Sequence, residues 1–369
     1  MKLALVCSWL NQYGGAERVL EVIHSMYPEA PVYTSIYWPK ALPPAYRTWD
    51  IRTSFMDRLP LVHRHHQAFL LLYPLAFRSF DLSGFDLVLS VTSAFGHGVV
   101  KGSQASHVCY CLTPARFLWD YESYVAREGL MTTVRRLMPL FLRSLREWDR
   151  RAAAGVDQFV AISEAVRARI RQHYQRDSQL IYPPVDVQSL PLSVDTGNHY
   201  VIISRLVPYK RIDLAVQAFN ELGLPLVIIG DGRDREALQA MARPNVRFLG
   251  RLSDQEARAY LADCRAFVFP GEEDFGIAPL EAQAVGKPVI AFAGGGALDT
   301  VIDGVTGIFF HQAESASLAD AVRRMESDYR RFSGPQIREL AMRFDRAVFV
   351  DKFGALISSF NEPGKLGKE

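Results

Sequence analysis

Two short segments of this 369-residue sequence carry charged side chains at spacings that suit the binding of an anion. In the first segment, Arg205 ends an apolar run at residues 200–204, and Lys210 opens a helix-like pattern at 210–222. Two cations beside the N-terminus of a helix form a pocket for a diphosphate, because the free amides and both side chains attract negative charge. A solvated charged loop is the alternative explanation for this segment taken alone.

The second segment places two carboxylates eight residues apart, at Glu273 and Glu281. It follows an apolar, strand-like run at residues 266–269, and Pro279 suits the first turn of a helix. Glu281, about one turn into that helix, is predicted to reach a ribose diol, and Glu273 is predicted to reach a sugar hydroxyl. The backbone amides predicted to meet a phosphate are those of Gly276, Ile277 and Ala278. The alternative is a capped helix with acidic residues near its start.

Glycines elsewhere in the chain are less specific. Gly14 and Gly15 follow the first strand-like run, where the missing side chain lets the backbone approach a phosphate; an ordinary tight turn explains them equally well. Three glycines at 294–296 are expected to form a flexible loop at the same edge. The segment 230–232 lacks the third glycine of a dinucleotide fingerprint, and no Asp-x-Asp sequence occurs. We therefore expect neither a cofactor nor a metal ion.

The elements that must position these residues have an α/β pattern. Through the second half of the chain, apolar strand-like runs alternate with amphipathic helices, which indicates a parallel sheet covered on both faces. Pro183 and Pro184 cannot lie inside a helix or a central strand, so they indicate an extended linker between two domains, with the boundary between residues 181 and 182. Ligands of such sheets bind at the carboxyl ends of the strands.

Composition excludes several classes of protein. Hydrophobic residues make up 49% and charged residues 22%, which is typical of globular domains rather than of disordered or coiled-coil chains. The net charge of +2 is small for a dedicated nucleic-acid binder. The four cysteines match no zinc spacing and indicate a reducing compartment, and no apolar run is long enough to span a bilayer. We expect a cytoplasmic protein.

Motifs across nearly the whole chain resemble the retaining family-4 glycosyltransferases, which have the GT-B fold. These motifs are GGAE at 14–17, YCLTPARFLWD at 110–120, AISEAVRARI at 161–170, YPPVD at 182–186, SRLVPYKR at 204–211, GDG at 230–232 and EDFGIAPLE at 273–281. The last segment has the Glu-x7-Glu pattern of that family. The amino-acid sequences of segments 110–120 and 273–307 are most similar to those of bacterial mannosyltransferases of O-antigen and exopolysaccharide assembly. The usual donor of those enzymes is GDP-mannose.

The resemblance implies two Rossmann-like domains that face one another across a cleft. Residues 1–181 would bind the acceptor, residues 182–344 would bind the nucleotide-sugar donor, and a helix in 345–369 would pack back on the first domain. Catalysis would be metal-independent. The acceptor hydroxyl would attack on the face from which the diphosphate leaves, and a leaving phosphate oxygen would take its proton.

The resemblance also assigns roles residue by residue. Arg205 and Lys210 would hold the departing diphosphate, and Glu273 would bind the transferred sugar; these three form the predicted catalytic set. Base recognition is expected near Arg251 and Leu252. The full donor-binding set implied is Gly14, Gly15, Arg205, Lys210, Arg251, Leu252, Glu273, Phe275, Gly276, Ile277, Ala278 and Glu281.

One departure from the family pattern affects the acceptor side. Leu112 stands where many relatives have a histidine that contacts the donor sugar, so that role is not carried over. His107 and Arg116 are the candidate acceptor-binding residues, although a surface arginine explains Arg116 equally well. With Leu112 at this position, a changed donor specificity and a catalytically inactive member of the family are both open.

Two basic, partly apolar segments are candidates for docking on an anionic membrane, at residues 44–80 and 135–151. A helix with an apolar core-facing side and a solvated basic back is the alternative. Three other activities stay open for the chain as a whole: transfer from a UDP-sugar, transfer to a soluble acceptor as in sucrose or trehalose synthesis, and nucleotide-sugar epimerisation. A catalytically inactive nucleotide-sugar binder is the non-enzymatic alternative.

Overall fold

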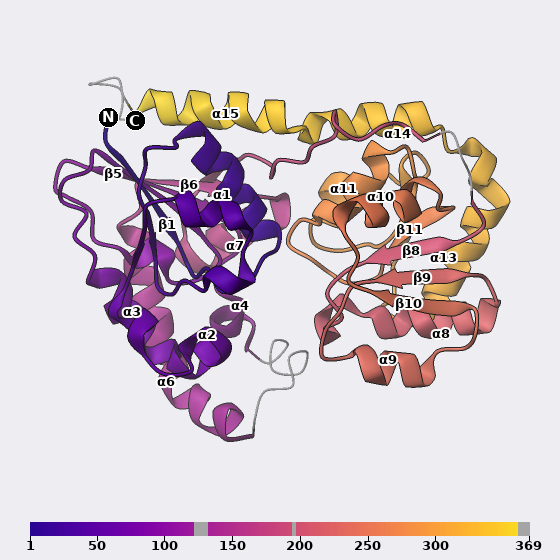
Figure 1. The fold of residues 1–369 in the computed structure, drawn as a ribbon, viewed down its shortest axis with the longest axis horizontal. Coiled ribbons are helices and arrows are strands. Elements are labelled where there is room, and N and C mark those ends of the chain that lie inside the picture. Colours follow the sequence, from indigo (N-terminus) through magenta and orange to yellow (C-terminus); the bar gives the residue numbers. More distant parts are fainter. Residues whose placement is uncertain (122–131, 194–196, 361–369) are drawn as a thin grey trace. The chain divides into compact units, whose positions relative to one another are not determined.

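The computed structural model describes residues 1–121, 132–193 and 197–360 (Figure 1). The chain divides into two compact units, each with its own sheet and hydrophobic core. Unit 1 consists of Met1–Tyr182 and the C-terminal residues from Phe349 onward, and unit 2 consists of Pro183–Val348. The division after Tyr182 lies one residue from the expected boundary, and the C-terminal division lies four residues beyond residue 344.

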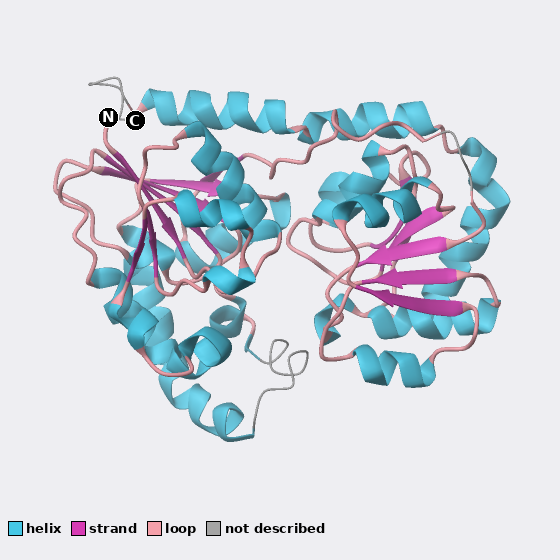
Figure 2. Cartoon of the chain, viewed as in Figure 1, coloured by secondary structure: helices cyan, strands magenta, loops and turns pink. Residues whose placement is uncertain are grey.

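Unit 1 is built on a parallel sheet of seven strands in the order β3-β2-β1-β4-β5-β6-β7. Its strands are β1 (Leu3–Cys7), β2 (Val32–Thr34), β3 (Ile51–Thr53), β4 (Leu87–Thr92), β5 (Ser106–Cys111), β6 (Gln158–Ala161) and β7 (Ser178–Leu180). The central strands β1 and β4 are buried along their whole length, because helices cover both faces of the sheet (Figure 2). The order reverses direction beside β1, as in doubly wound nucleotide-binding sheets.

Amphipathic and capped helices connect these strands. The helices are α1 (Gly15–Met26), α2 (Val62–His65), α3 (Tyr73–Arg78), α4 (Arg116–Trp119), α6 (Thr132–Ala154) and α7 (Glu164–Tyr174). Helix α1 buries Val19, Leu20 and Ile23, whose spacing of one, three and four residues places them on one face. Ser163 caps α7 by accepting a hydrogen bond from the Val166 amide at 3.1 Å, which satisfies an amide that has no partner within the helix.

The C-terminal helix α15 (Arg346–Ser359) packs back on unit 1, which confirms the crossover expected for the GT-B fold. Phe349 and Phe353 stack on one another with ring centres 5.1 Å apart, and both meet the edge of Tyr110 in β5 at 5.8 and 5.7 Å. Phe349, Phe353 and Ile357 are at most 2% exposed. One face of this helix, from its first turn onward, is therefore buried in unit 1.

Unit 2 has a parallel sheet of six strands in the order β10-β9-β8-β11-β12-β13. The strands are β8 (Tyr200–Ile203), β9 (Leu226–Ile229), β10 (Val246–Gly250), β11 (Ala266–Phe269), β12 (Val289–Phe292) and β13 (Gly307–Phe310). The helices are α8 (Ile212–Leu222), α9 (Arg235–Met241), α10 (Asp254–Ala262), α11 (Ile277–Ala284), α12 (Ala297–Thr300), α13 (Ser315–Asp328) and α14 (Gly334–Ala341). The alternation of strands and helices expected from the sequence is confirmed.

Within unit 2, the segment after the two linker prolines is bonded to the segment that leads into α15. The Val185 amide donates to the Phe344 carbonyl at 3.0 Å, and the Arg346 amide donates to the Val185 carbonyl at 2.9 Å. Asp345 accepts a further bond from the Gln188 amide at 2.9 Å. The two passages of the chain through this region therefore form a short parallel bridge rather than two independent loops.

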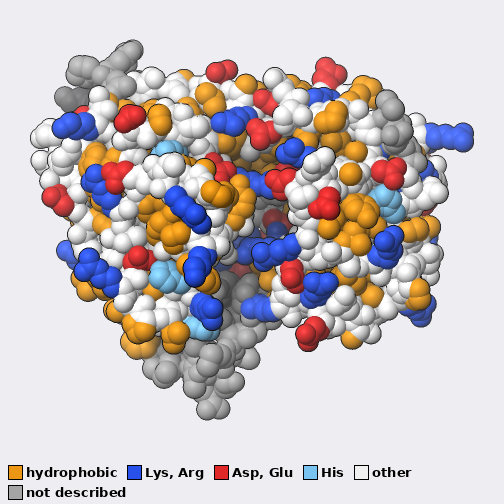
Figure 3. Space-filling view, in the orientation of Figure 1, with side chains coloured by type: hydrophobic (Ala, Val, Ile, Leu, Met, Phe, Trp, Pro, Cys, Tyr) orange, Lys and Arg blue, Asp and Glu red, His pale blue; other side chains and the backbone are white. Residues whose placement is uncertain are grey.

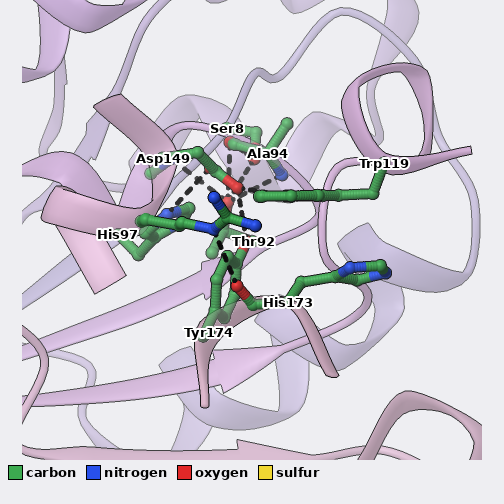
Figure 4. A network of polar contacts seen from close by, with 10 residues as sticks. Ser8, Thr92, Ala94, His97, Trp119, Asp149, His173 and Tyr174 are labelled. Carbon is green, nitrogen blue, oxygen red and sulfur yellow. Dashed lines mark hydrogen bonds and ion pairs between the residues drawn. The ribbon is translucent and has the colours of Figure 1, made fainter. Parts of the chain in front are cut away.

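A buried carboxylate ties the helices of unit 1 together. Asp149 on α6 is fully buried, accepts hydrogen bonds from Trp119 Nε1 at 2.7 Å and the Tyr174 hydroxyl at 2.9 Å, and pairs with His97 Nε2 at 3.1 Å (Figure 4). The Trp119 indole also stacks on His173, with ring centres 4.6 Å apart. The partners of Asp149 come from α4, from α7 and from the turn after β4. One charge thus fixes four segments.

Replacement of this carboxylate should destabilise the protein in a pH-dependent way. We expect Asp149→Asn to lower the free energy of unfolding by about 3–5 kcal/mol, since it leaves a buried partner charge uncompensated. Burial lowers the pKa of His97, but the hydrogen bond and charge of Asp149 outweigh burial and raise it above the usual 6.5. The stabilisation is therefore complete below that unfolded-state pKa and is lost as the pH rises through the raised folded-state pKa.

Urea unfolding of the two proteins over roughly pH 5 to 9 measures this difference. Trp119→Phe is the matched control, because it removes one hydrogen bond to Asp149 and leaves the ion pair in place. A difference between wild type and Asp149→Asn that stays constant across the pH range would contradict the assignment to His97.

Candidate functional site

The first predicted segment follows β8 and forms a turn rather than the start of a helix. Residues Pro208–Lys210 make a single 3₁₀ turn, and α8 begins only at Ile212. The expected helix start at Lys210 is therefore two residues too early. Arg211, with a φ of +52°, adopts a left-handed conformation that breaks the helical path between the turn and α8. Lys210 is consequently the last residue of the turn and is not part of α8.

The second predicted segment follows β11, the strand next to β8 in the sheet. Helix α11 begins at Ile277, and Gly276 precedes it with a φ of +96°. A side chain at Gly276 would also place its Cβ 2.8 Å from the Phe269 ring, so glycine is required for two reasons. The amides of Ile277 and Ala278 belong to the first turn of α11, where helical geometry provides no acceptor within the helix.

The two segments meet through an ion pair. The Lys210 ammonium contacts the Glu273 carboxylate, and these side chains are 14% and 19% exposed. On the other side of the turn, Arg205 Nη2 donates a hydrogen bond to the Tyr209 hydroxyl at 2.8 Å. All three residues of the predicted catalytic set thus lie at the carboxyl ends of two adjacent strands, as ligand sites of parallel sheets do.

Glycines beneath these two loops allow their close approach. A Cβ at Gly271 would lie 2.8 Å from the carbonyl oxygens of Tyr209 and Lys210, so the turn rests directly on the backbone after β11. A Cβ at Gly230 would collide with the Ser204 carbonyl oxygen, and one at Gly232 would collide with that of Leu206. The 230–232 segment is not a dinucleotide fingerprint, and its packing role was not predicted from the sequence. The one sequence signal for that role is the position of these glycines directly after a strand.

The three glycines at 294–296 are in contact with the second segment, contrary to the expectation of a flexible loop. The Gly296 amide donates to the Glu273 carbonyl at 2.8 Å. A Cβ at Gly295 would collide with the same carbonyl oxygen, and one at Gly296 would collide with Phe275 Cα. The loop after β12 therefore supports the backbone that carries Glu273.

Other members of the predicted donor-binding set have different surroundings. Glu281 is half-buried on α11, Arg251 is exposed, and Leu252 is half-buried after β10. Phe275 is 4% exposed and packs edge-on against Phe344 at 5.8 Å. Because that ring is in the core, the expected role of Phe275 in binding the donor is limited to its backbone.

The predicted site residues of unit 1 divide into two groups. Gly14 and Gly15 lie at the start of α1, and Gly14 has an extended backbone with a φ of −165° that any residue adopts. Their contact with a donor phosphate stays a prediction. Arg116 is the half-buried first residue of α4, and Leu112 is half-buried directly after β5.

His107 does not have the position of an acceptor-binding residue. It lies at the start of β5, is 1% exposed, and its Nε2 is hydrogen-bonded to the Ser90 hydroxyl at 2.8 Å. Burial lowers its pKa to about 3, so the imidazole is neutral. The sequence interpretation of His107 is therefore wrong, because the strand runs through the core and presents this side chain to the neighbouring strand β4.

The site is described by its charged groups. Over the described ranges of the chain, no group of three or more His, Cys, Asp or Glu side chains is arranged to hold a metal ion. The four cysteines are buried and form no disulfide. The site combines two cations, a carboxylate and helix-terminal amides, and such a combination binds a polyanion carrying hydroxyl groups.

Known proteins resemble this chain in sequence and in fold. Residues 191–346 match the family model described as "Glycosyl transferases group 1". The chain is 28% identical over 221 residues to the D-rhamnosyltransferase WbpZ of Pseudomonas aeruginosa, which covers 55% of this chain and 56% of that protein. It is 35% identical over 149 residues to a GDP-mannose-dependent phosphatidylinositol monomannoside mannosyltransferase of Mycolicibacterium smegmatis, which covers 36% and 39%. The chain thus spans 56% and 39% of the lengths of these two curated relatives.

Solved structures match over nearly the whole chain. Anabaena Alr3699/HepE in complex with UDP-glucose has a TM-score of 0.74 at 18% identity, and the match covers 97% of this chain and 100% of that one. The lipopolysaccharide outer core galactosyltransferase WaaB has a TM-score of 0.69 at 19% identity, with 97% and 99% covered. The fold is therefore GT-B. Residues 191–346, which make up most of unit 2, are similar to the group 1 glycosyl transferases.

The Lys210–Glu273 pair makes a prediction about anion affinity. Glu273→Gln is expected to bind inorganic pyrophosphate about fivefold to tenfold more tightly than wild type, because the carboxylate that neutralises Lys210 is gone. Isothermal titration calorimetry with pyrophosphate measures the change. Glu314→Gln, which removes an exposed negative charge elsewhere in unit 2, is the control. Weaker binding by Glu273→Gln would contradict the view that Lys210 faces the anion.

Proposed function

We propose that this protein transfers a hexose from a nucleotide-sugar to a glycan or lipid-linked acceptor in the synthesis of a cell-surface polysaccharide, with retention of anomeric configuration. One observation carries the proposal: Lys210 pairs with Glu273, which lies just before the N-terminus of α11, and Arg205 is bonded to Tyr209 on the turn that carries Lys210. Cations and helix-terminal amides suit a diphosphate, and a carboxylate suits the hydroxyls of the sugar attached to it.

Mannose from GDP-mannose is the favoured donor within this proposal. The Mycolicibacterium smegmatis relative is named as GDP-mannose-dependent, whereas the HepE structure holds UDP-glucose. The sequences of segments 110–120 and 273–307 are similar to those of mannosyltransferases, and this similarity favours GDP-mannose as the donor. A UDP-sugar donor is the alternative, as is a soluble acceptor.

In the proposed reaction, the acceptor hydroxyl attacks the anomeric carbon on the face from which the diphosphate departs. The bond between that carbon and the diphosphate oxygen breaks, and the departing oxygen takes the acceptor's proton. Arg205, Lys210 and the first-turn amides of α11 stabilise the negative charge that develops on the diphosphate. Because fixed protein charges do this, we propose that no metal ion is required.

Lys210→Ala is expected to lower the rate of sugar transfer about 100-fold or more, which is the typical effect of removing one group that stabilises a transition state. Transfer is measured with labelled GDP-mannose and labelled UDP-glucose, each with and without a lipid-linked acceptor. Arg330→Ala, an exposed cation elsewhere in unit 2, is the control and should keep full activity.

Three results would contradict the proposal. An unchanged rate in Lys210→Ala would remove this residue from the reaction. Loss of wild-type turnover on addition of a chelator would contradict metal independence. Donor binding without any turnover, and equal in wild type and variant, would indicate an inactive nucleotide-sugar binder.

We further propose peripheral contact with an anionic membrane through α2, α3 and the residues around them, on the cytoplasmic side. Leu61, Leu71 and Leu75 are 70%, 48% and 60% exposed, and Arg64 and Arg78 lie in the same segment. Figure 3 shows hydrophobic side chains among basic and histidine side chains over the part of unit 1 that holds α2 and α3. Such a mixture suits the interface of an anionic bilayer.

The second candidate docking segment is α6. Its basic residues Arg143, Arg150 and Arg151 are exposed, but Leu142 and Leu145 are buried in the core. The side chains of Arg135, Arg136, Met138 and Leu140 lie outside the described residues. In the described part of the chain, none of the helices has the length and apolar character needed to span a bilayer.

A double variant tests the membrane contact. Leu61→Ser with Leu75→Ser is expected to reduce co-sedimentation with phosphatidylglycerol vesicles about tenfold, because two exposed apolar side chains no longer enter the interface. Leu298→Ser is the matched control, since Leu298 is also 60% exposed but belongs to unit 2. Equal sedimentation of the double variant and wild type would contradict the proposal, as would wild-type protein that binds no anionic vesicles.

A further inference from the structure

Tyr209 lies between the two cations of the proposed diphosphate site and contacts both of them. Its hydroxyl accepts a hydrogen bond from Arg205 Nη2 at 2.8 Å. Its ring faces Lys210, whose Nζ is 5.3 Å from the ring centre. The two contacts use different parts of one side chain, the polar tip and the aromatic face.

The position of Tyr209 is fixed by its backbone. The Lys210 amide donates to the Val207 carbonyl at 3.0 Å, which closes the 3₁₀ turn. The carbonyl oxygens of Tyr209 and Lys210 lie against Gly271, where any Cβ would come within 2.8 Å of both. The turn therefore cannot shift toward β11. The phenol, half-buried at this turn, is held in place while its tip stays beside the exposed Arg205.

Two like charges at one site repel one another and do not keep a fixed separation without support. Lys210 is paired with Glu273, which holds the ammonium from the side of the second segment. Tyr209 adds an aromatic face for the same ammonium and a hydrogen-bond acceptor for the guanidinium. One phenol side chain thus links the two cations to each other.

We propose that Tyr209 is a positioning residue that sets the separation and orientation of Arg205 and Lys210 for the departing diphosphate. This inference rests on the proposed function and deepens it, because it names what keeps the two cations aligned before a donor arrives. Tyr209 itself is not assigned a contact with the reacting atoms. Its hydroxyl acts through Arg205 and its ring acts through Lys210.

Two substitutions distinguish the contact of the Tyr209 hydroxyl with Arg205 from that of the ring with Lys210. Tyr209→Phe removes the hydroxyl and keeps the ring, so Arg205 retains its charge but loses its orientation. We expect kcat to fall about tenfold, while the KM for the donor changes less than about threefold, since long-range attraction for the diphosphate persists. Tyr209→Leu removes both contacts, and we expect it to lower kcat further and to raise the Kd for GDP or UDP about tenfold.

The measurements are steady-state transfer with labelled donor and isothermal titration calorimetry with GDP and with UDP. Tyr329→Phe is the matched control: Tyr329 also has an arginine over its ring, with Arg265 Cζ 3.9 Å from the ring centre, but it lies after α13. This control should keep the wild-type kcat and Kd. Thermal unfolding of all variants shows whether the turn itself is intact.

The outcomes are distinguishable. Wild-type protein that binds neither GDP nor UDP would overturn the proposed function and this role with it. Wild-type protein that binds and turns over, with Tyr209→Phe equal to it in kcat, would overturn the role of Tyr209 alone. A raised KM with unchanged kcat and a lower melting temperature in Tyr209→Phe would show a merely structural residue, which also contradicts the proposal.

Discussion

The Lys210–Glu273 ion pair is the interaction on which the candidate site depends. It joins the loops after two neighbouring strands, β8 and β11, and neither loop positions its charged residue alone. Both side chains are largely shielded from water, so their attraction is less screened than that of a surface pair. The same shielding makes an unpaired ammonium costly, and in the proposed function a bound diphosphate would be a second partner for Lys210.

Close backbone contact makes that ion pair possible. Gly271 admits the turn that carries Lys210, and Gly295 and Gly296 admit the loop that carries Glu273. A Cβ at any of these positions would clash with the neighbouring backbone. The site therefore requires glycines at the edge of the sheet as well as charged residues. This arrangement explains why the glycines cluster after the strands of unit 2 rather than in one phosphate-binding loop.

Much of this architecture was predictable because it depends on local periodicity. Apolar strands alternating with amphipathic helices predicted the parallel sheet of unit 2, and the charged residues that follow two of its strands predicted that Arg205, Lys210 and Glu273 lie at one edge of that sheet. The helix start at Ile212 and the burial of His107 were not predictable, since each depends on tertiary contacts. Arg211 adopts a left-handed conformation that an arginine does not predict. His107 follows the polar Ser106 on a strand that is buried on both faces, so the residue types do not indicate which side chain is buried.

The misread histidine and the buried Asp149 illustrate one physical point about polar residues in parallel sheets. A strand covered on both faces has no solvent side, so any polar side chain on it or beside it must find a partner within the core. His107 finds Ser90, and Asp149 finds Trp119, Tyr174 and His97. Polar residues within the strands and buried helix faces of such a fold therefore report on packing, whereas those at the carboxyl ends of the strands report on binding. Lys210 and Glu273 follow the carboxyl ends of β8 and β11, and the proposed function places them in the second group.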